Sequence, residues 1–588
     1  MLALLLLLPL TISALLSPIL REHFGAIKYV ALLASIITLA MLPFVSTGVT
    51  NSLLWFSISG YNFHITTQTM PLNMILLWLI AIITPLIIAY SIGFMETPSE
   101  QARFYFELCV FASAMLLFAM SGNFIAMFIG WEMLGITSYL LIGFWYYKEK
   151  PPQAARKAII TVFIGDMMML AAMAIIWNAY GTFNFSALAS AGVKAPLFYA
   201  MLLVMFAAFT KSAQFPFQEW LPDAMEGPTP VSAFLHSSTM VKAGVFIIAV
   251  LLPIYEELSM GWLLVAFGII TAIIAMADAL VEKHIKRILA YSTIEDMGLM
   301  FVALGFGSIV GAMVLFVAQA FYKALLFMNA GTIMNANEGA ESIYSSYESR
   351  SSKPLFAVMI IGVLSIIGVF PLSGFFGKIG VEGSASNPVV YAILLVIDFV
   401  TAIYMVRWVA VPSRKAPSQY ESALISSNYR LTPKSMMIPQ YILAALVIAA
   451  SAAFIYAAPS YSPYLKLPLR AIESFIETIV VFIGSIIGIY IISKYAQLSS
   501  ERHPVLYSIA YSTGFFNSAY RYIASAFAIA GSAFEAFEYS LYDFIKLGGS
   551  AVVDFGAYVR KIENGQINTY AMAFAIGILI AIAMMVLL

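Results

Sequence analysis

Charged residues are scarce in this chain. Asp, Glu, Lys and Arg together make up 10% of its 588 residues, the 30 cations equal the 30 acids in number, and no basic run stands out. The sequence therefore gives no reason to expect nucleic acid as a partner. Cysteine is nearly absent, since Cys109 is the single one in the sequence. An internal disulfide is therefore excluded, and there is no Cys-x-x-Cys motif that would indicate an iron–sulfur cluster or structural zinc. We expect no cofactor and no metal site in this chain, so any coupled redox chemistry takes place elsewhere.

Hydrophobic residues, by contrast, make up 62% of the chain and recur in long segments. Soluble globular domains do not have this composition. A membrane-spanning helix needs about 20 mostly apolar residues, and about sixteen such segments follow one another. They lie near residues 2–20, 27–46, 72–94, 103–121, 123–146, 154–178, 197–215, 229–252, 260–281, 286–306, 308–335, 354–377, 386–411, 437–458, 472–494 and 567–588. The sequence predicts an all-α polytopic membrane protein.

The cations predict the orientation of these spans. Loops after odd-numbered spans hold most of them, and loops after even-numbered spans hold few, with Lys194, Lys466 and Arg470 as the main exceptions. Because cytoplasmic loops carry the excess of Lys and Arg, we expect the N-terminus outside and the odd loops in the cytoplasm. The first apolar run has no charged segment before it, so we expect a retained span rather than a cleaved signal peptide.

A different pattern follows the fifteenth segment. Between Tyr520 and Phe544, apolar residues recur at steps of three and four, which is typical of a one-sided helix. Glu535, Glu538 and Asp543 interrupt the hydrophobicity and argue against another span. We therefore expect a long amphipathic helix within residues 500–560 that lies along the membrane surface, followed by a C-terminal span at 567–588.

Ionisable residues inside the predicted spans are the main candidates for function, because each charge at mid-membrane costs about 2.5–3.5 kcal/mol. The candidates are Glu132, Asp166, Lys211, His236, Lys242, Asp278, Glu295, Asp296, Lys323, Lys378 and Asp398. Any one of them could instead reach the membrane surface or form a structural pair. For Asp278, which is close to the loop with Lys283, we expect one of these two roles, a side chain that reaches the membrane surface or a structural pair.

Lys211 and Lys378 stand where an apolar helix meets a helix breaker. Pro216 follows Lys211, and Lys378 lies in the glycine-rich SGFFGKIGVEG of residues 373–383. Broken helices are tolerated at membrane depth only beside protein or a water-filled cavity. We expect both helices to lose regular hydrogen bonding within a few residues of the lysines, and two broken helices suggest two half-channels.

A buried lysine suits proton transfer, since a nearby carboxylate can control whether the amine holds or releases its proton. We choose Glu132 as the partner of Lys211. Thr239 and Ser238 lie one turn before Lys242, and Gln319 lies one turn before Lys323, so these side chains are expected to solvate the two amines.

At these residues the chain resembles the antiporter-like subunits of respiratory complex I, and most of all the subunit L family. The resemblance rests on five segments: GWEMLGITSYLLIGFWYY at 130–147, KSAQFPFQEWLPDAMEGPTPVSAFLHSSTMVKAGV at 211–245, IKRILAYSTIEDMGLM at 285–300, AFYKALLFMNAGTI at 320–333 and GQINTYAMAFAIGILIAIAMM at 565–585. The large subunits of multisubunit sodium/proton antiporters are similar as well.

The resemblance implies two inverted five-helix repeats at residues 103–252 and 260–411, after three spans in 1–102 and before two spans in 437–494. It further implies that Glu132 pairs with Lys211, that His236 and Lys323 connect the half-channels, and that Lys378 faces the exit. Lys242 belongs to the same relay. The lateral helix would brace sister subunits. The implied setting is a prokaryotic plasma membrane.

Several positions depart from the family pattern. Leu315 and Gln319 stand where subunit L usually has histidines. Ile379 follows the exit lysine where an acid is frequent, and Glu382 is the nearest substitute. Two further departures are the acids Glu295 and Asp296, which replace a more neutral pair, and the charge of Lys242. With Asp166, Gln319, Glu382 and Asp398, the acid pair makes up a secondary set of proton-path candidates.

We therefore expect a proton-translocating membrane subunit of a complex I-like quinone oxidoreductase, without a redox centre of its own. NADH or another donor such as reduced deazaflavin or ferredoxin, flavin, iron–sulfur clusters and quinone would bind to partner subunits. The partners would be sister antiporter-like subunits and quinone-site membrane subunits. The alternative is a subunit of a multisubunit sodium/proton antiporter that is driven by an ion gradient, and the lateral helix favours the first reading.

Overall fold

The computed structural model describes residues 2–19, 24–58, 61–95 and 97–465, together with three dipeptides between 479 and 487. All of them belong to the first of two units, Met1–Ser512, into which the chain divides; the second is Thr513–Leu588. The predicted lateral helix at 500–560 and the span at 567–588 lie outside the described residues, as does nearly all of the predicted span at 472–494.

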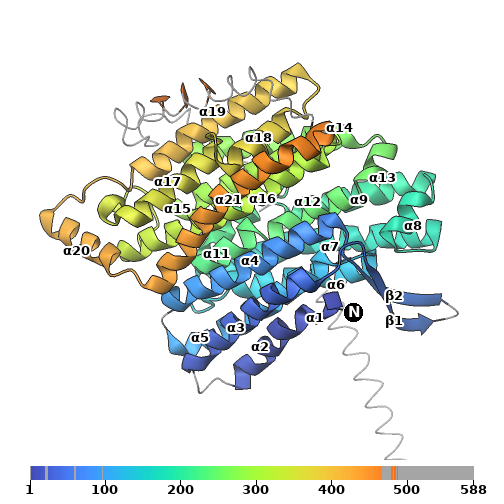
Figure 1. Cartoon of the computed structure of the whole chain (residues 1–588), viewed down its shortest axis with the longest axis horizontal. Coiled ribbons are helices and arrows are strands. Elements are labelled where there is room, and N and C mark those ends of the chain that lie inside the picture. Colours follow the sequence, from blue (N-terminus) through green and yellow to red (C-terminus); the bar gives the residue numbers. More distant parts are fainter. Residues whose placement is uncertain are drawn as a thin grey trace, which may run out of the picture. The chain divides into compact units, whose positions relative to one another are not determined.

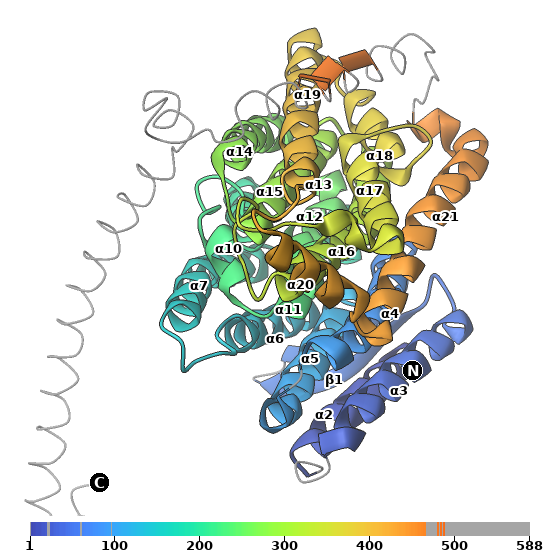
Figure 2. The same ribbon diagram turned by 90° about the vertical axis from the view of Figure 1, so that its left-hand side faces the viewer.

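The described unit consists almost entirely of helices (Figures 1 and 2). The long helices are α3 (Phe24–Met41), α4 (Pro71–Phe94), α5 (Pro98–Ala119), α6 (Phe124–Ile142), α7 (Lys150–Tyr180), α14 (Gly261–Val281), α15 (Ile285–Gly305), α16 (Ile309–Ala336), α19 (Pro388–Ala410) and α21 (Lys434–Leu465). The shorter helices are α1 (Leu2–Leu5), α2 (Leu7–Ile19), α8 (Phe185–Ser190), α9 (Ala195–Lys211), α10 (Trp220–Asp223), α11 (Thr229–Ser237), α12 (Met240–Val250), α13 (Leu252–Glu257), α17 (Lys353–Ile367), α18 (Ser373–Glu382) and α20 (Gln419–Arg430). Three 3₁₀ turns complete the set: η2 (Leu42–Phe44), η3 (Ala224–Glu226) and η4 (Ser349–Ser351).

Eleven of the described helical segments are long and apolar enough to cross a membrane, and the polytopic all-α class is confirmed. Three shorter apolar helices accompany them, at Leu7–Pro18, Ala195–Lys211 and Lys353–Ile367. Each of the first fourteen predicted spans overlaps one of these segments. The total of about sixteen stays a prediction, because the last two predicted spans fall outside the described residues.

Helix α16 lies inside the bundle, where it packs against α11, α15, α18 and α21. Figure 2 shows it surrounded by these elements. Close helix packing depends on small residues at the contacts. At the α14–α15 contact, a Cβ added at Gly268 would lie 2.6 Å from the Gly298 carbonyl oxygen, so neither helix could keep its position with a larger residue there.

The predicted break at Lys211 is confirmed, because α9 ends at this residue and regular helix resumes only at Trp220. Ala213 has a φ of 50°, and Phe215–Pro216 is a cis peptide. These are conformations that no α-helix contains.

The second break lies between Ile367 and Ser373, ahead of Lys378 rather than beside it. Gly368 ends α17 with a φ of 90°, and Phe370–Pro371 is a second cis peptide. Lys378 itself is within α18, so the prediction that the clustered glycines interrupt the helix at this lysine is wrong. Those glycines are helical, and their role is contact: a Cβ at Gly377 would lie 2.8 Å from Leu315 Cα on α16.

We expect Gly374→Ala to destabilise the protein by about 1–3 kcal/mol or more, because its Cβ would overlap the main-chain oxygen of Ser365. The measurement is the thermal unfolding midpoint of the purified chain in detergent. Gly25→Ala is the matched control, because a Cβ at Gly25 meets nothing within 4 Å. Equal midpoints for the two variants would contradict the proposed α17–α18 contact.

A third break was not predicted. The predicted span at 229–252 is two helices, α11 and α12, separated at Ser238 and Thr239. Thr239 Oγ1 donates a 2.6 Å hydrogen bond to the Phe234 carbonyl oxygen, which the break leaves without its helical partner. The signal in the sequence was the run of three hydroxyl residues at 237–239, since such side chains compete for main-chain hydrogen bonds.

A β-hairpin was also missed. Strand β1 (Thr50–Ile58) pairs antiparallel with β2 (Tyr61–Gln68), with Leu53 opposite Ile65. The enrichment of aromatic and β-branched residues around a Ser-Gly turn could have predicted it. Asn123, at the start of α6, anchors the hairpin through a 2.7 Å bond from its Nδ2 to the His64 carbonyl oxygen.

Candidate functional site

Lys211 is fully buried at the end of α9. Its Nζ donates a hydrogen bond to the Trp131 carbonyl oxygen on α6 and lies 4.2 Å from the centroid of the Trp131 ring. Trp131 Nε1 in turn donates a 2.6 Å bond to Asp166 Oδ1 on α7. The break after Lys211 therefore places the amine between two neighbouring helices, where the ring and Asp166 surround it.

Lys211 and Glu132, the predicted partners, form no salt bridge among the described residues, and they interact only electrostatically. The amine interacts electrostatically with Asp166 first and with Glu132 second. Successive residues of a helix point about 100° apart, so Trp131 faces inward while Glu132 is left half-buried. Asp166, which is 2% exposed and was only a secondary candidate, is the better placed carboxylate.

His236 and Lys242 lie on the two sides of the α11–α12 break and are fully buried. The His236 ring lies between those of Trp220 and Phe327, with centroids 6.2 Å from each, and neither ring nitrogen has a hydrogen-bond partner among the described residues. Trp220 also donates a 2.9 Å bond to the Thr210 carbonyl oxygen, which links this region to the end of α9.

The hydroxyls of Ser238 and Thr239 do not solvate Lys242, contrary to prediction. Both donate to the Phe234 carbonyl oxygen instead, because the broken helix leaves that oxygen free. Lys242 Nζ donates to the Phe316 carbonyl oxygen and lies 4.3 Å from the Phe316 ring centroid. The amine also interacts electrostatically with Asp296 and Lys323.

Lys323 lies on α16 and contacts α15. Its Nζ donates a 2.5 Å bond to Ser292 Oγ and forms a 3.2 Å ion pair with Asp296 Oδ2. Tyr322 donates a 3.1 Å bond to the same Asp296 oxygen. The prediction that Gln319 solvates Lys323 is wrong: neither polar atom of its side-chain amide has a hydrogen-bond partner within the described part of the chain.

Glu295 lies between the two lysines of this half. Thr401 and Tyr404 on α19 donate bonds of 2.5 and 3.0 Å to its two carboxylate oxygens. It interacts electrostatically with Lys378 and, more weakly, with Lys323. The departure from the family pattern at Glu295 and Asp296 thus places one carboxylate beside each lysine.

Lys378 forms a 2.5 Å ion pair with Asp398 Oδ1, and both side chains are almost fully buried. The acid that pairs with Lys378 therefore comes from α19 rather than from α18. Glu382, which the sequence suggested as the substitute, lies one helical turn beyond Lys378 and is not within salt-bridge distance of it. Asp398, predicted as a secondary candidate, takes that role because α18 and α19 face each other only in the folded chain.

The structure thus joins five of the predicted residues into one buried polar series. From Lys323 through Asp296, Glu295 and Lys378 to Asp398, each member pairs or interacts electrostatically with the next. Lys211 with Asp166 forms a second group, and His236 is in direct contact with neither. Sequence reasoning missed the hydroxyl donors Tyr322, Thr401 and Tyr404 and the hydroxyl acceptor Ser292. Their spacing was a usable signal, because Thr401 and Ser292 lie about one helical turn from Asp398 and Glu295.

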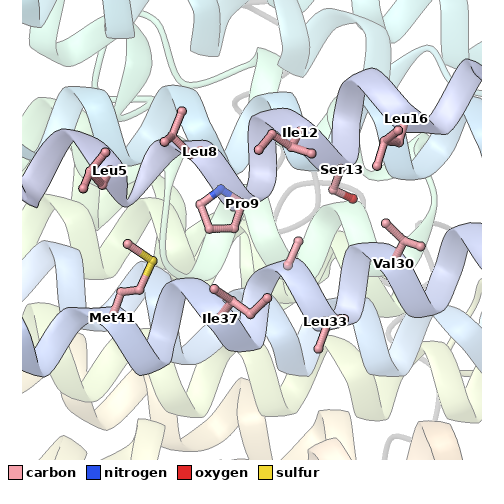
Figure 3. Close-up of a pocket in the computed structure, with 11 residues that line it drawn as sticks. Leu5, Leu8, Pro9, Ile12, Ser13, Leu16, Val30, Leu33, Ile37 and Met41 are labelled. Carbon is pink, nitrogen blue, oxygen red and sulfur yellow. The ribbon is translucent and has the colours of Figure 1, made fainter.

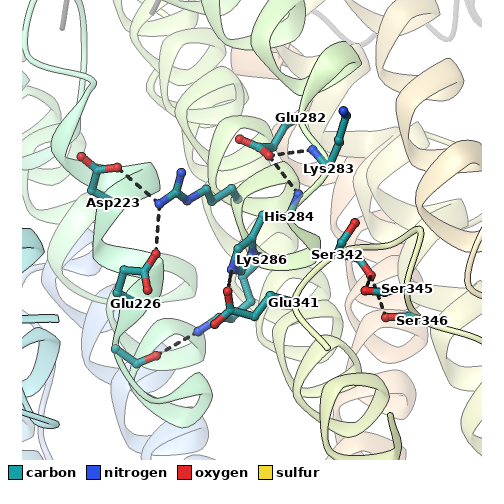
Figure 4. A network of polar contacts seen from close by, with 12 residues as sticks. Asp223, Glu226, Glu282, Lys283, His284, Lys286, Glu341, Ser342, Ser345 and Ser346 are labelled. Atoms are coloured by element: carbon teal, nitrogen blue, oxygen red, sulfur yellow. Dashed lines mark hydrogen bonds and ion pairs between the residues drawn. The ribbon is translucent and has the colours of Figure 1, made fainter. Parts of the chain in front are cut away.

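A network of ion pairs lies at one end of the same helices (Figure 4). Arg287 contacts Glu226 at 3.0 Å and Asp223 at 3.6 Å, and Lys157 contacts Asp223 at 2.8 Å. Next to them, burial lowers the pKa of His284. Its Nδ1 accepts the Lys286 N–H at 3.1 Å, so the neutral ring carries its proton at Nε2, which faces Glu341 at 3.6 Å.

A groove of about 440 Å³ between α2 and α3 differs in character from these sites (Figure 3). Aliphatic side chains such as Leu8, Ile12 and Leu33 line it, and Ser13 is the one hydroxyl residue in the lining. The groove contains no group that could carry a proton. It is suited to apolar chains of the surrounding lipid.

The fold and these side chains define a class: a polytopic helical membrane protein with lysine–carboxylate pairs inside its bundle. Residues 121–404 match the family described as NADH:quinone oxidoreductase/Mrp antiporter, transmembrane, and residues 55–105 match the N-terminus of chain 5 of NADH-ubiquinone oxidoreductase (complex I). The chain belongs to this family of antiporter-like membrane subunits.

Individual relatives agree with this assignment. The chain is 30% identical to NAD(P)H-quinone oxidoreductase chain 5 of a Picosynechococcus species, over 89% of this chain and 87% of that protein. It is 35% identical to NAD(P)H-quinone oxidoreductase subunit 5 of Paulinella chromatophora, over 60% of this chain and only 56% of that protein. The structure of the Mrp complex from a Dietzia species has a similar fold, with a TM-score of 0.74, 21% identity, and coverage of 100% of this chain and 63% of that one.

Proposed function

We propose that this chain is a proton-translocating membrane subunit of a complex I-like quinone oxidoreductase. The observation that carries the proposal is the buried series Lys323, Asp296, Glu295, Lys378 and Asp398. Ionisable groups inside membrane proteins mark ion and proton pathways, because their burial is too costly to persist without a role. Family membership supports the same reading.

In this mechanism the lysines hold and release the proton. An amine beside a carboxylate keeps its proton, and the same amine without that charge gives it up in a medium of low dielectric constant. Asp398 and Asp296 each neutralise one lysine, and Glu295 interacts with both amines. A change in the distance of one carboxylate would therefore pass a proton from Lys323 toward Lys378. Asp166 serves Lys211 in the same way, with Glu132 as the weaker partner.

The topology that we propose has sixteen spans, with inverted repeats at 103–252 and 260–411 and a lateral helix within 500–560. Two observations support the repeats: a helix is interrupted after α9 and again after α17, and a buried lysine lies close to each interruption. The positive-inside bias supports an outside N-terminus in a prokaryotic plasma membrane and places the network with Arg287 in the cytoplasm.

The proposed partners are sister antiporter-like subunits and quinone-site subunits of the same membrane complex. NADH or a related donor, flavin, iron–sulfur clusters and quinone would bind to those partners. The exposed face of the β-hairpin, with Leu54 and Trp55 more than half exposed, supports contact with a neighbouring subunit or with the membrane surface.

The second candidate is a subunit of a multisubunit sodium/proton antiporter, which the fold similarity to the Mrp complex favours. Sealed vesicles that contain the intact complex separate the two readings. If the first is right, an electron donor with quinone generates a pH gradient without sodium, and a quinone-site inhibitor abolishes it. A pH gradient that follows an imposed sodium gradient without any donor would favour the antiporter and overturn the first reading.

We expect Glu295→Gln to lower proton translocation per electron pair by about tenfold or more, because an amide cannot exchange a proton between the two lysines. The measurement is the pH gradient in sealed vesicles, normalised to intact complex. Gln319→Leu is the control: it is equally buried, and removing an amide that has no hydrogen-bond partner among the described residues should be nearly neutral. A large effect of Gln319→Leu with none of Glu295→Gln would place the path elsewhere.

A further inference from the structure

Asp278 belongs to no group described so far. It lies on α14, one turn before the helix ends, and the sequence predicted that its side chain reaches the membrane surface or forms a structural pair. The first of these is wrong, because Asp278 is 1% exposed. Neither carboxylate oxygen has a hydrogen-bond partner among the described residues, and no ion pair there includes it.

The broken segment after Lys211 lies along the same face of α14. Thr271 and Asp278 are seven residues apart and so share one side of the helix. Thr271 Oγ1 accepts a 3.0 Å bond from Phe215 N–H, which places residues 212–219 against that side. Glu219, at the end of the segment, interacts electrostatically with Asp278.

This segment contributes further unpaired polar atoms. Gln218 is 2% exposed and Glu219 3% exposed. Both side-chain polar atoms of Gln218 and one oxygen of Glu219 have no hydrogen-bond partner in the part of the chain that the structure describes. Buried polar groups are normally satisfied, so the two unpaired oxygens of Asp278 and the unpaired oxygen of Glu219, on carboxyl groups that interact electrostatically, indicate a site that exchanges a ligand.

The charged groups around Asp278 indicate that the ligand is a proton. Glu282 is a further acid and accepts main-chain N–H bonds from Lys283 and His284, at 2.6 and 2.9 Å (Figure 4). Arg407 on α19 reaches this end of α14, but its N–H groups donate to the main-chain oxygens of Ala279, Leu280 and Glu282. The described part of the chain has no cluster of three or more acidic, histidine or cysteine side chains that could hold a metal ion. A buried carboxyl group without a cation takes up a proton instead.

The positions of these groups also suggest a direction. Glu219 interacts electrostatically with Lys157, Asp223 and Arg287, and Asp223 forms partly exposed ion pairs with both of these cations. Lys211 is at the other end of the same broken segment, eight residues before Glu219. The carboxyl pair thus lies between an ion-pair network at the protein surface and the buried amine.

We propose that Glu219 and Asp278 form a proton-loading site, in which two buried carboxyl groups share one proton taken up at the Lys157–Arg287 face and supply it to Lys211. The proposal rests on the proposed function and adds the point of uptake to it. One proton moves at each step: Glu219 accepts it from water at the surface, Asp278 receives it, and the Lys211 amine takes it from Asp278 past the broken segment 212–218, which carries Ser212, Gln214 and Gln218.

The test uses the intact complex in sealed vesicles. Asp278→Asn and Glu219→Gln keep size and shape but cannot exchange a proton, and each should lower proton translocation per electron pair by about tenfold with near-normal assembly. Glu257→Gln, at an exposed acid on α13, is the matched control and should pump like the parent. Proton translocation by Lys211→Ala is measured in the same assay, because this variant tests the proposed function itself.

A chemical probe gives an independent readout. Dicyclohexylcarbodiimide adds to protonated carboxyl groups in apolar surroundings and not to ionised ones, so mass spectrometry should find the adduct on Asp278 at neutral pH. No adduct on Asp278, or parent-like pumping by Asp278→Asn while Lys211→Ala fails, would overturn the loading site and leave the proposed function standing. Parent-like pumping by Lys211→Ala as well would overturn the proposed function itself.

Discussion

Replacing Lys211 with arginine is expected to stop proton translocation as completely as replacing it with alanine. Guanidinium keeps its proton at any physiological pH. The variant would therefore carry a fixed charge at a position where the transport cycle needs a side chain that gains and releases a proton. The pH gradient per electron pair in sealed vesicles should fall by about tenfold or more in both variants. The abundance of intact complex, measured on the same membranes, should fall much less.

Controls for this prediction come from the same chain. Lys194→Arg makes the same exchange at an exposed lysine that belongs to none of the proposed proton sites, and it should pump like the parent. Glu132→Gln and Asp166→Asn should both lower translocation, and Asp166→Asn should have the larger effect because Asp166 interacts more strongly with the amine. If Lys211→Arg pumps normally, Lys211 is a fixed structural charge and the half-channel around it must be abandoned.

Removing the carboxylate of Asp398 is expected to damage both assembly and pumping. Lys378 would be left as a buried charge without its 2.5 Å partner, which typically costs about 3–5 kcal/mol. Asp398→Asn should therefore reduce both the amount of intact complex and its thermal stability, measured by native gel electrophoresis and by unfolding in detergent.

A double variant separates stability from function. Lys378→Met with Asp398→Leu replaces the whole pair by apolar side chains of similar volume, which is often neutral for stability. Assembly should recover while proton translocation stays lost. Glu382→Gln tests the partner that the sequence suggested, and it should cost less than Asp398→Asn because Glu382 is not within salt-bridge distance of Lys378. If the double variant pumps, the proton does not pass through Lys378.

Local features of the chain were predictable, and partners across helices were not. The positions of the fourteen described spans, the buried lysines and the break after Lys211 all follow from composition or from a proline within a short window of sequence. The break at Ser238 and Thr239 was missed because it depends on hydroxyls that capture the Phe234 carbonyl oxygen. The hairpin at 50–68 was missed because the sequence prediction for that region considered apolar membrane-spanning segments and not strands.

The sequence by itself determined that this chain crosses a membrane many times and carries lysines, acids and a histidine inside its helices, because hydropathy and the cost of buried charge are properties of each segment. Only the tertiary structure decided which acid faces which amine. Asp398 rather than Glu382 meets Lys378, Asp296 rather than Gln319 meets Lys323, and Asp166 comes before Glu132 at Lys211. Ion pairs depend on distances of a few ångström between different helices, and those distances are set by how α15, α16, α18 and α19 pack, at contacts where glycines allow close approach.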